Sequence, residues 1–377
     1  MRIAYLSASR IPSRKANAVQ VMQMCQAFAT LGHQVMLFAR PGSETAEDVH
    51  AYYGVSRTFD IVWCRRPGIE GLGGLLYGRR VARAVTARPL PEAFYGRDIY
   101  SLVAVASLGR PMVFEAHMLP TGIVGKALQR WLFRRKNFSR LVVISRALAQ
   151  GYRELFPWLE EAVVVVAPSA LDATHAHAAA HPQAIDVRQR AGGRTQVGYV
   201  GQLYQGKGVE LILALARRLP DIDFHLVGGT DELVTYWRNA SQDMPNIRFH
   251  GHVAPAQTEQ FRQAMDVLLA PYQEAVLTEH GSRNIAPWMS PLKLVEYMGS
   301  RKSIIASDLA ALRETLEHEI NALLVPAADV EAWARAVTRL AEDPGLRERL
   351  AARACHDARQ RFDLRARARA VLHGVAP

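Results

Sequence analysis

Short apolar runs rich in Val and Ile alternate along this chain with stretches of helical periodicity, and this alternation constrains its fold more than any other feature. In the first half the runs read RIAYLSA, HQVMLFA, FDIVWC, PMVFEA, RLVVIS and AVVVVA. Such runs, separated by amphipathic segments, are typical of parallel strands that crossover helices bury on both faces. The first half is therefore predicted to form an α/β domain around a parallel sheet.

A second series of the same kind begins after residue 193. Its predicted strands read TQVGYVG, DFHLVGG, NIRFHG, DVLLAPY, SIIAS and NALLVP, and helices are predicted over residues 209–218, 255–265, 312–317, 330–342 and 344–361. Residues 171–193 lack a long apolar period and are predicted to be a linker, in which His175, His177 and His181 have no metal-ligand spacing. The chain is thus predicted to form two doubly wound domains, over residues 1–180 and 194–361, that bind ligands at the carboxyl ends of their strands.

The cysteines and the apolar pattern favour a reducing compartment. Cys25, Cys64 and Cys355 are odd in number and widely separated, so they indicate neither a disulfide framework nor a zinc site. The first residues, MRIAYLSASRIPSRK, lack the apolar core of a secretion signal, and no run reaches the roughly 18 apolar residues of a spanning helix. We expect a cytoplasmic protein, either free or peripheral to the inner face of the membrane.

The net charge of +11 is concentrated in the first half of the chain. Residues 1–190 carry 24 Lys and Arg against 13 Asp and Glu, whereas residues 191–377 carry 22 of each. Within residues 125–140, Trp131 and Leu132 stand among several arginines, a composition that suits a helix lying on an anionic membrane surface. The alternative is an ordinary crossover helix that packs these two side chains on the sheet. The basic residues form no nucleic-acid recognition motif.

The segment YVGQLYQGKGVELIL predicts a ligand-binding loop between a strand and a helix. It contains Gly201, Gly206, Lys207 and Gly208. Glycines let the backbone approach a ligand, a helix N-terminus offers free N–H groups to an anion, and a lysine supplies a point charge suited to phosphate. The alternative is a turn whose lysine is merely solvated.

The segment MSPLKLVEYMG places a lone carboxylate, Glu296, among apolar residues. Ser290 is predicted to cap a helix that has Pro291 in its first turn. Lys293 and Glu296 are three residues apart on this helix, and a carboxylate at the edge of a sheet is suited to bind two vicinal hydroxyls. The alternative is an exposed Lys293–Glu296 pair, worth only about 0.3 kcal/mol.

Together these segments resemble the donor half of the glycosyltransferase family 4 enzymes (glycosyl transferases group 1). The resemblance rests on GQLYQGKG, NIRFHGHV, DVLLAPY, SPLKLVEYMGSRKSIIASD and NALLVP, in this order, and extends to ANAVQVMQMCQAFATLGHQVMLFA and FEAH in the first half. It implies the GT-B fold, in which two Rossmann-like domains face each other. It also implies an acceptor side on the first domain, a donor side on the second, and a tail over residues 362–377 that crosses back to the first domain.

The resemblance assigns roles to particular residues. It implies that Glu296 binds the ribose of a nucleotide-sugar, that Lys207 neutralises its diphosphate, and that His117 bonds to the donor sugar near the reacting carbon, so that these three residues are the expected catalytic group. The expected donor-binding residues are Ala16, Asn17, Gly201, Gln202, Lys207, Ser290, Pro291, Leu292, Lys293 and Glu296. Glu115 is expected to be structural, pointing to the strand face opposite His117.

The chain departs from the family pattern at two positions. Many members have a second glutamate eight residues before the ribose-binding one, where this chain has Trp288, and a basic residue after the glycine, where this chain has Gln202. Arg283 or Lys293 is expected to supply the missing charge. In the first domain, the loop with Ala16 and Asn17 is basic and small enough to approach a phosphate. No glycine occurs before Gly32, which disfavours a dinucleotide fingerprint and hence a dehydrogenase.

The resemblance implies a retaining glycosyltransferase that moves a sugar from a nucleoside-diphosphate sugar to an acceptor hydroxyl, in glycan or glycolipid biosynthesis. The acceptor is expected to be lipid-linked or a polysaccharide. No cofactor and no metal is expected, because a lysine and helix dipoles stabilise the departing diphosphate. The alternatives are a GT-B sugar-nucleotide epimerase and a non-catalytic module that binds a nucleotide-sugar or a polyanion.

Overall fold

The computed structural model of the protein describes residues 1–42, 44–172, 193–277 and 284–375. The predicted linker and its three histidines lie almost entirely outside these residues. The chain divides into two compact units, one formed by Met1–Pro168 with Leu364–Pro377 and the other by Ser169–Asp363. Among the described helices, none has the length and apolar composition needed to cross a bilayer.

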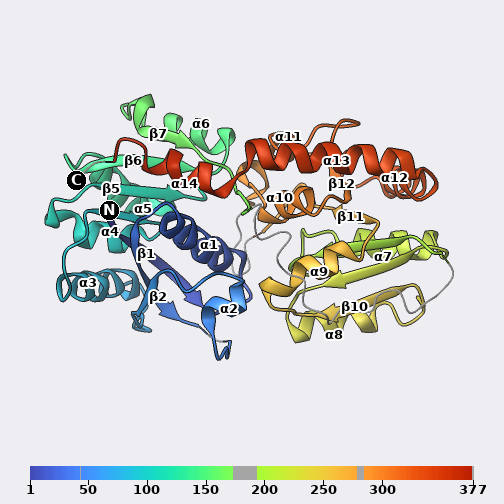
Figure 1. Ribbon diagram of the computed structural model, residues 1–377, viewed down its shortest axis with the longest axis horizontal. Helices are drawn as coiled ribbons and strands as arrows, with labels where there is room; N and C mark the ends of the chain where they lie inside the picture. Colours follow the sequence, from blue (N-terminus) through green and yellow to red (C-terminus); the bar gives the residue numbers. More distant parts are fainter. Residues whose placement is uncertain (43, 173–192, 278–283, 376–377) are drawn as a thin grey trace. The chain divides into compact units, whose positions relative to one another are not determined.

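The first unit is built on a seven-stranded parallel sheet (Figure 1). Its strands are β1 (Arg2–Ile11), β2 (Gln34–Pro41), β3 (Asp60–Trp63), β4 (Ala93–Gly96), β5 (Met112–Ala116), β6 (Phe138–Val143) and β7 (Val164–Val166), in the order β3-β2-β1-β4-β5-β6-β7. Six of them correspond to the predicted apolar runs. The sequence pattern missed β4, because its four residues, AFYG, follow a proline-rich stretch and are too short to show a period.

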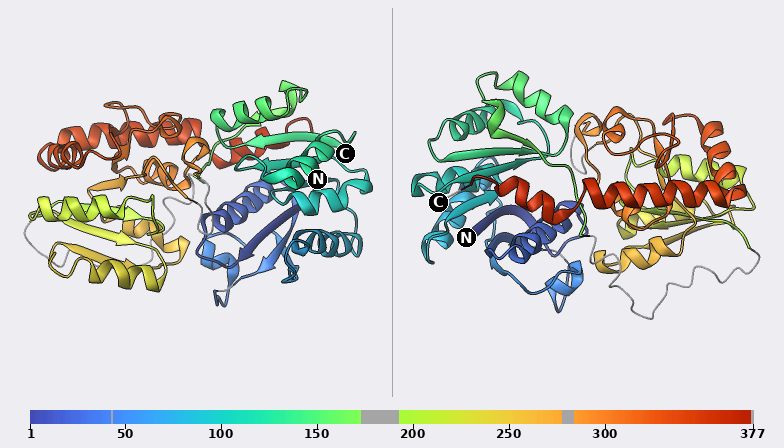
Figure 2. Two further views of the ribbon diagram at one scale, coloured as in Figure 1. Left: turned by 180° about the vertical axis from the view of Figure 1, so that it is seen from behind. Right: turned by 45° about the horizontal axis from the view of Figure 1, so that its top comes forward.

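Helices cover both faces of this sheet. They are α1 (Ala16–Thr30), α2 (Val49–Tyr53), α3 (Gly73–Thr86), α4 (Ile99–Val105), α5 (Gly122–Phe133), α6 (Arg146–Leu155) and α14 (Leu364–Leu372), with 3-10 turns η1 (Ala106–Leu108) and η2 (Glu161–Val163). Helix α1 contacts α2 and α14, whereas α4 contacts α3 and α5 (Figure 2). The last helix of the chain is therefore part of the first unit and lies beside α1.

The second unit is built on a six-stranded parallel sheet. Its strands are β8 (Gln196–Val200), β9 (Asp223–Val227), β10 (Ile247–Gly251), β11 (Val267–Ala270), β12 (Ser303–Ser307) and β13 (Leu323–Val325), in the order β10-β9-β8-β11-β12-β13. Its helices are α7 (Val209–Arg218), α8 (Asp231–Asn239), α9 (Thr258–Gln263), α10 (Leu292–Gly299), α11 (Ala310–Arg313), α12 (Val330–Glu342) and α13 (Pro344–Arg361), with 3-10 turns η3 (Pro255–Gln257) and η4 (Ala286–Trp288).

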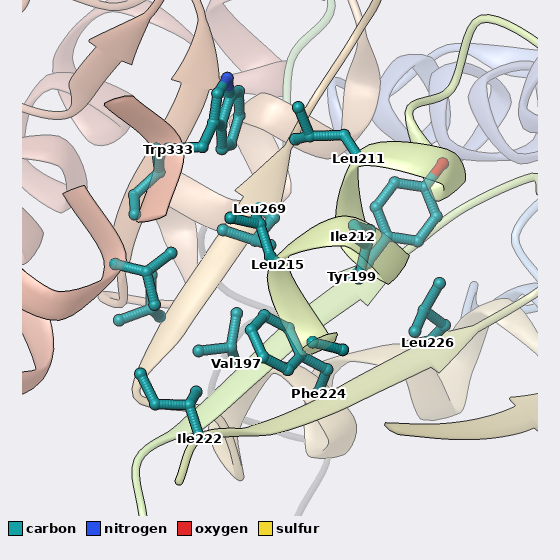
Figure 3. Close-up of a cluster of buried hydrophobic side chains, with 14 of the residues drawn as sticks. Val197, Tyr199, Leu211, Ile212, Leu215, Ile222, Phe224, Leu226, Leu269 and Trp333 are labelled. Carbon is teal, nitrogen blue, oxygen red and sulfur yellow. The ribbon is translucent and has the colours of Figure 1, made fainter. Parts of the chain in front are cut away.

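Two apolar cores hold the second sheet between its helices. In one, Val197, Phe224 and Leu269 of the sheet pack with Ile212 of α7 and Trp333 of α12 (Figure 3). In the other, side chains of α9, α10 and α13 pack with those of β11 and β12. Burial on both faces explains why these strands read as continuous apolar runs.

The helix predictions for the second unit need three corrections. The helix predicted over residues 255–265 is a 3-10 turn, η3, followed by the shorter helix α9 over Thr258–Gln263. Helix α8 was not predicted, because its sequence, DELVTYWRN, is short and mostly polar; only Val234 and Trp237 are buried. Helix α11 covers Ala310–Arg313 rather than residues 312–317. The predicted GT-B type of architecture, with two Rossmann-like parallel sheets, is confirmed.

Strand order locates the ligand edge of each unit. In the first sheet the order reverses between β1 and β4, and in the second between β8 and β11. All pairings are parallel, so the carboxyl ends of the strands lie along one edge of each sheet. Ligands of doubly wound sheets bind outside this edge at the point of reversal.

Candidate functional site

In the second unit, the loop between β8 and α7 is held closely against the end of β11. Gly206 and Gly208 have φ values of +87° and +81°, a region that favours glycine. A Cβ atom at Gly208 would overlap the carbonyl oxygen of Pro271, and one at Gly206 would overlap that of Ala275. These two glycines therefore allow the loop to pack tightly at the carboxyl edge and fix the position of Lys207 between them.

The Lys207 ammonium lies over two aromatic rings. Its Nζ is 5.0 Å from the ring centroid of Tyr204 and 4.9 Å from that of Tyr272, which follows β11. Burial lowers the pKa of Lys207 to about 8. The group is not the merely solvated lysine of the alternative interpretation, but a partly desolvated cation held at the point of strand reversal.

Lys293, in the first turn of α10, faces the same place. Its Nζ is 3.8 Å from the ring centroid of Tyr199 and 5.0 Å from that of Tyr272. This Nζ is buried and has no hydrogen-bond partner among the described residues. Burial, and then the Lys207 charge, lower the pKa of Lys293 far below its usual value, although Glu296 opposes this. The predicted alternative of an exposed Lys293–Glu296 pair is therefore wrong.

Gly201, at the end of β8, provides the space that Lys293 occupies. A Cβ atom at this position would lie 2.6 Å from Lys293 Nζ. Gln202 follows it, and the Gln202 carbonyl accepts a hydrogen bond of 2.6 Å from the Tyr199 hydroxyl. The structure thus brings Gly201, Lys207 and Lys293 together around a small group of tyrosines.

Glu296, one turn after Lys293, lies beside an arginine. The Glu296 side chain is 23% exposed, and its Oε2 is 3.6 Å from Nη1 of Arg262 in α9. Arg262 is fixed by hydrogen bonds from its Nη2 to Glu259 (2.9 Å) and from its Nε to Ser300 Oγ (2.9 Å). Sequence reasoning did not identify Arg262; the one available signal was its spacing of three residues from Glu259 on a helix.

The start of α10 differs from the prediction. Pro291 is the N-cap residue and Leu292 is the first helical residue. The Ser290 hydroxyl instead accepts a hydrogen bond of 2.9 Å from the Ser169 backbone N–H, and the Ser290 carbonyl accepts one of 2.5 Å from the Ser169 hydroxyl. Ser290 was a wrong prediction for the cap, because a residue far away in the sequence occupies its side chain. Trp288 ends η4 just before this segment, and Arg283 lies outside the described residues.

In the first unit, Ala16 and Asn17 belong to a helix rather than to the predicted loop. Helix α1 begins at Ala16, with Lys15 as its N-cap residue, and both Ala16 and Asn17 are exposed. Asn17 Nδ2 donates a hydrogen bond of 3.2 Å to Ser9 Oγ of β1. The loop after β1 is therefore shorter than predicted, and these two residues form the first turn of α1.

His117 follows β5 and is bonded to a buried carboxylate. Its Nε2 is 2.6 Å from Oε1 of Glu115. The prediction that Glu115 points to the opposite face is wrong, because residues two apart in an extended strand lie on the same face. Burial lowers the pKa of His117 to about 4, so the imidazole is neutral at pH 7, with Nε2–H donating to the carboxylate.

Glu115 is a centre of buried hydrogen bonds in this unit. Its carboxylate accepts from Gln20 Nε2 of α1 at 3.1 Å and from the Tyr95 hydroxyl of β4, and it pairs with Arg367 of α14 at 3.2 Å. Burial by itself would raise the pKa of Glu115, but the Arg367 guanidinium and the His117 bond hold it well below its usual value. Glu115 is therefore an ionised group that orients His117.

Sequence profiles of known families match both units. A profile described as "Glycosyl transferases group 1" matches residues 194–343, and one described as "Glycosyl transferase 4-like domain" matches residues 17–170. A phosphatidyl-myo-inositol mannosyltransferase of Mycolicibacterium smegmatis is 31% identical over 153 residues, which are 39% of this chain and 36% of that protein. The chain thus aligns with little more than a third of the length of this relative.

Solved structures of low sequence identity share the fold over nearly the whole chain. HepE of Anabaena in complex with UDP has a TM-score of 0.72 at 18% identity and covers 98% of both chains. Sucrose-phosphate synthase of Thermosynechococcus elongatus has a TM-score of 0.72 at 18% identity, over 97% of this chain and 96% of that one. A glycosyltransferase of Rickettsia africae has a TM-score of 0.75 at 12% identity over 99% of both chains. The profiles and the two parallel sheets agree, and the chain belongs to the family 4 type of glycosyltransferases with the GT-B fold.

Proposed function

We propose that this protein transfers a sugar from a nucleoside-diphosphate sugar, bound to the second unit, to a hydroxyl of an acceptor bound to the first. The observation that carries the proposal is the pair of lysines at the carboxyl edge of the second sheet. Lys207 and Lys293 both lie over the Tyr272 ring, and the Lys293 ammonium is buried without a hydrogen-bond partner in the described part of the chain. HepE of Anabaena, one neighbour of the same fold, is described in complex with UDP and with UDP-glucose, which supports a nucleotide-sugar as the donor.

A diphosphate would supply what the lysine pair lacks. A buried cation without a partner is destabilising, and the neighbouring Lys207 charge increases the cost for Lys293. A bound diphosphate favours the charged form of both lysines and accepts their hydrogen bonds. As the glycosidic bond breaks, negative charge grows on the departing diphosphate, and these fixed cations stabilise it. Lys293 thereby replaces the basic residue that the family pattern has where this chain has Gln202.

Glu296 is proposed to bind the ribose hydroxyls. Arg262 approaches this carboxylate from one side at 3.6 Å, while its own position is fixed by Glu259 and Ser300. Such an arrangement orients the carboxylate without satisfying all of its acceptor sites, since an ionised carboxylate offers about four lone-pair positions. Two vicinal hydroxyls would take the remaining ones.

His117 is proposed to contact the transferred sugar, and the reaction is proposed to retain the anomeric configuration without a metal. Because Nε2–H of His117 donates to Glu115, its Nδ1 is left with a lone pair that accepts a hydrogen bond from a sugar hydroxyl. The leaving phosphate takes the proton of the acceptor hydroxyl. Proton NMR of the anomeric centre during turnover tests the stereochemistry: a product of unchanged configuration supports retention, and an inverted product would contradict it.

Nucleotide protection tests the donor site directly. We expect one of UDP, GDP, ADP, dTDP and CMP to raise the melting temperature selectively. The variants Lys207→Ala, Lys293→Met and Glu296→Ala should each need at least about tenfold more nucleotide for the same rise in melting temperature. The reason is that each variant loses one charge-assisted hydrogen bond to the nucleotide. Lys126→Ala and Glu342→Ala, both exposed and on other elements, are the matched controls. No protection by any nucleotide up to millimolar concentration would contradict the proposal.

Helix α5 is proposed to hold the protein on an anionic membrane surface on the cytoplasmic side. Its first turn exposes Ile123 (88%) and Val124 (63%), and its last turn exposes Trp131 (43%), whereas Leu132 is buried. The exposed basic residues of this segment are Lys126, Arg130, Arg134, Arg135 and Lys136. An apolar tip within a basic surface is typical of interfacial helices. The crossover-helix alternative therefore accounts for Leu132 but not for Trp131.

Vesicle sedimentation tests this surface. The protein should bind vesicles of phosphatidylcholine with phosphatidylglycerol more tightly than vesicles of phosphatidylcholine alone. Ile123→Ser with Val124→Ser should weaken this binding at least about tenfold, from the loss of two apolar side chains. The control is Ile320→Ser, an exposed apolar residue of the second unit. Equal binding to both kinds of vesicle, or no effect of the double change, would overturn the membrane role.

A further inference from the structure

We propose that the first unit contains a phosphate-binding site formed by Arg10, Arg40 and Arg66, and that the acceptor carries a phosphate monoester or diphosphate. The role of this group as part of an acceptor rests on the proposed transferase function. The site itself rests on the arginines alone, which lie in a unit that contains neither of the donor-site lysines.

The three arginines come from the ends of three adjacent strands. Arg10 in β1 and Arg40 in β2 are direct partners in the register of the parallel pair. Arg66 follows β3, the next strand in the sheet, and its side chain turns toward the start of α3, where a Cβ atom at Gly73 would lie 3.1 Å from its Nε. Because these strands are parallel, all three arginines lie along the carboxyl edge, where doubly wound sheets bind their ligands.

The charges in this cluster are only partly compensated by the protein. In the described part of the chain, none of the three guanidinium groups forms a hydrogen bond or an ion pair. Burial lowers the pKa of Arg40, and the charges of Arg10 and Arg66 lower it further. The acid that opposes this repulsion is Asp98, whose carboxylate already caps α4 by accepting hydrogen bonds from Ser101 N at 2.9 Å and Ser101 Oγ at 2.5 Å.

Repulsion of this kind is a cost that a bound anion removes. Arg40 is half-buried while Arg10 and Arg66 are exposed, and the charges of these two neighbours make the cationic state of Arg40 less favourable in the folded chain. Guanidinium groups are planar and present several N–H donors, so arginines suit the oxygens of a phosphate, which accept pairs of hydrogen bonds. A dianion matches a cluster of three cations better than a single carboxylate does.

The surroundings of Arg66 distinguish two sources of the phosphate. Trp63, Ile69, Leu72 and Leu75, which precede and follow Arg66 in the chain, are all exposed large apolar residues. A phosphate on a lipid would bring an apolar chain to these side chains, whereas a phosphate on a soluble sugar would not. The two sources share the same headgroup chemistry, and their affinities for this unit separate them.

Calorimetric titration tests the site in the full-length protein, saturated with the nucleoside diphosphate that protects it best, so that the donor site is filled. The probes are inorganic pyrophosphate and farnesyl diphosphate. We expect both to bind, and Arg10→Gln with Arg40→Gln to weaken both at least about tenfold. The control, Arg79→Gln with Arg83→Gln, removes the same charge from exposed positions on α3 and should change affinity less than about twofold. Tighter binding of farnesyl diphosphate than of pyrophosphate identifies a lipid-linked acceptor, and equal binding identifies a soluble one.

Two results would overturn the site. The phosphate site is contradicted if pyrophosphate binds the double variant as tightly as it binds the wild type, or if it binds neither protein. Both results count even when a nucleotide protects the wild type. If no nucleotide protects the protein, the proposed transferase function is contradicted. The phosphate site can then still be tested by the same titration of the Lys207→Ala variant, carried out without nucleotide. Near-ultraviolet circular dichroism verifies that the variants fold, and Arg66→Gln, at an exposed position, repeats the test with less risk to folding.

Discussion

Nη2 of Arg367 lies 3.2 Å from Oε2 of Glu115, and both side chains are almost fully buried, with 4% and 0% of their areas exposed. Arg367 belongs to the last helix of the chain, and Glu115 belongs to the strand that precedes His117. Arg367 also donates hydrogen bonds to the carbonyls of Ala167 (3.2 Å) and Pro168 (2.9 Å) at the end of the first unit's main segment. The ion pair therefore connects the returning helix to the carboxylate that orients the candidate histidine.

Removing Arg367 should destabilise the first unit strongly. Arg367→Met leaves the Glu115 carboxylate buried without its cation, which costs about 3–5 kcal/mol of unfolding free energy. Arg369→Met, an exposed arginine on the same helix, should cost less than about 0.5 kcal/mol. Urea denaturation of both variants measures the difference. Equal stability of the two variants would show that the pair contributes nothing to folding.

The stability of the protein should fall as the pH falls below neutrality. Burial holds the folded-state pKa of His117 at about 4, below its ordinary value of 6.5, so the unfolded chain binds the proton more readily between these values. The neutral imidazole contributes its full stabilisation above pH 6.5, and this stabilisation decreases as the pH falls toward 4. At pH 5 the unfolding free energy should be about 2 kcal/mol lower than at high pH. Denaturation at pH 7.5 and 5.0 measures this loss.

The variant His117→Asn is the control for this pH dependence. It removes the titrating group, so its stability should decline less between pH 7.5 and 5.0 than that of the wild type. Glu115, whose pKa is held low chiefly by Arg367 against the effect of burial, adds a second loss only at lower pH, as the pH falls through its depressed pKa. A wild type and variant with identical pH profiles would contradict a neutral, buried His117.

Lys293→Met should stabilise the protein while it weakens nucleotide binding. The substitution replaces a buried ammonium, which has no hydrogen-bond partner in the described residues, by a thioether that packs on the Tyr199 ring. We expect a gain of about 1 kcal/mol in unfolding free energy together with the loss of protection by nucleotide. Thermal denaturation with and without nucleotide measures both effects. A destabilised variant that still binds nucleotide normally would assign Lys293 to the fold rather than to the ligand.

Gly208→Ala should be far more costly than Gly32→Ala. Both glycines have similar φ values, +81° and +85°, but a Cβ atom at Gly208 would overlap the Pro271 carbonyl, whereas one at Gly32 meets nothing within 4 Å. Gly32→Ala should cost about 1 kcal/mol from backbone strain alone. Gly208→Ala adds displacement of the loop that carries Lys207, which urea denaturation and nucleotide protection both detect. Similar losses in the two variants would mean that the loop is not packed against β11.

The sequence pattern predicted most elements because both sheets are buried on two faces. The continuous apolar runs at β1, β5, β8 and β12 follow directly from that burial, and the helices α7, α12 and α13 have the predicted bounds. The pattern failed at β4 and α8, which are short and whose apolar residues show no period. It failed also at the start of α10, where Ser290 bonds to Ser169 instead of capping the helix, and Pro291 is the N-cap residue.

The sequence by itself determined two α/β units, the glycine loop before α7, the helix that carries Lys293 and Glu296, and the histidine after β5, because each of these depends on residues close together in the chain. Tertiary structure decided the rest. It desolvated Lys293 against Tyr199 and Tyr272, placed Arg262 beside Glu296, and joined Arg367 to Glu115. It also aligned Arg10 with Arg40 on neighbouring strands. The charge state and orientation of an ionisable group depend on burial and on partners that folding brings together, and these are not encoded in local spacing.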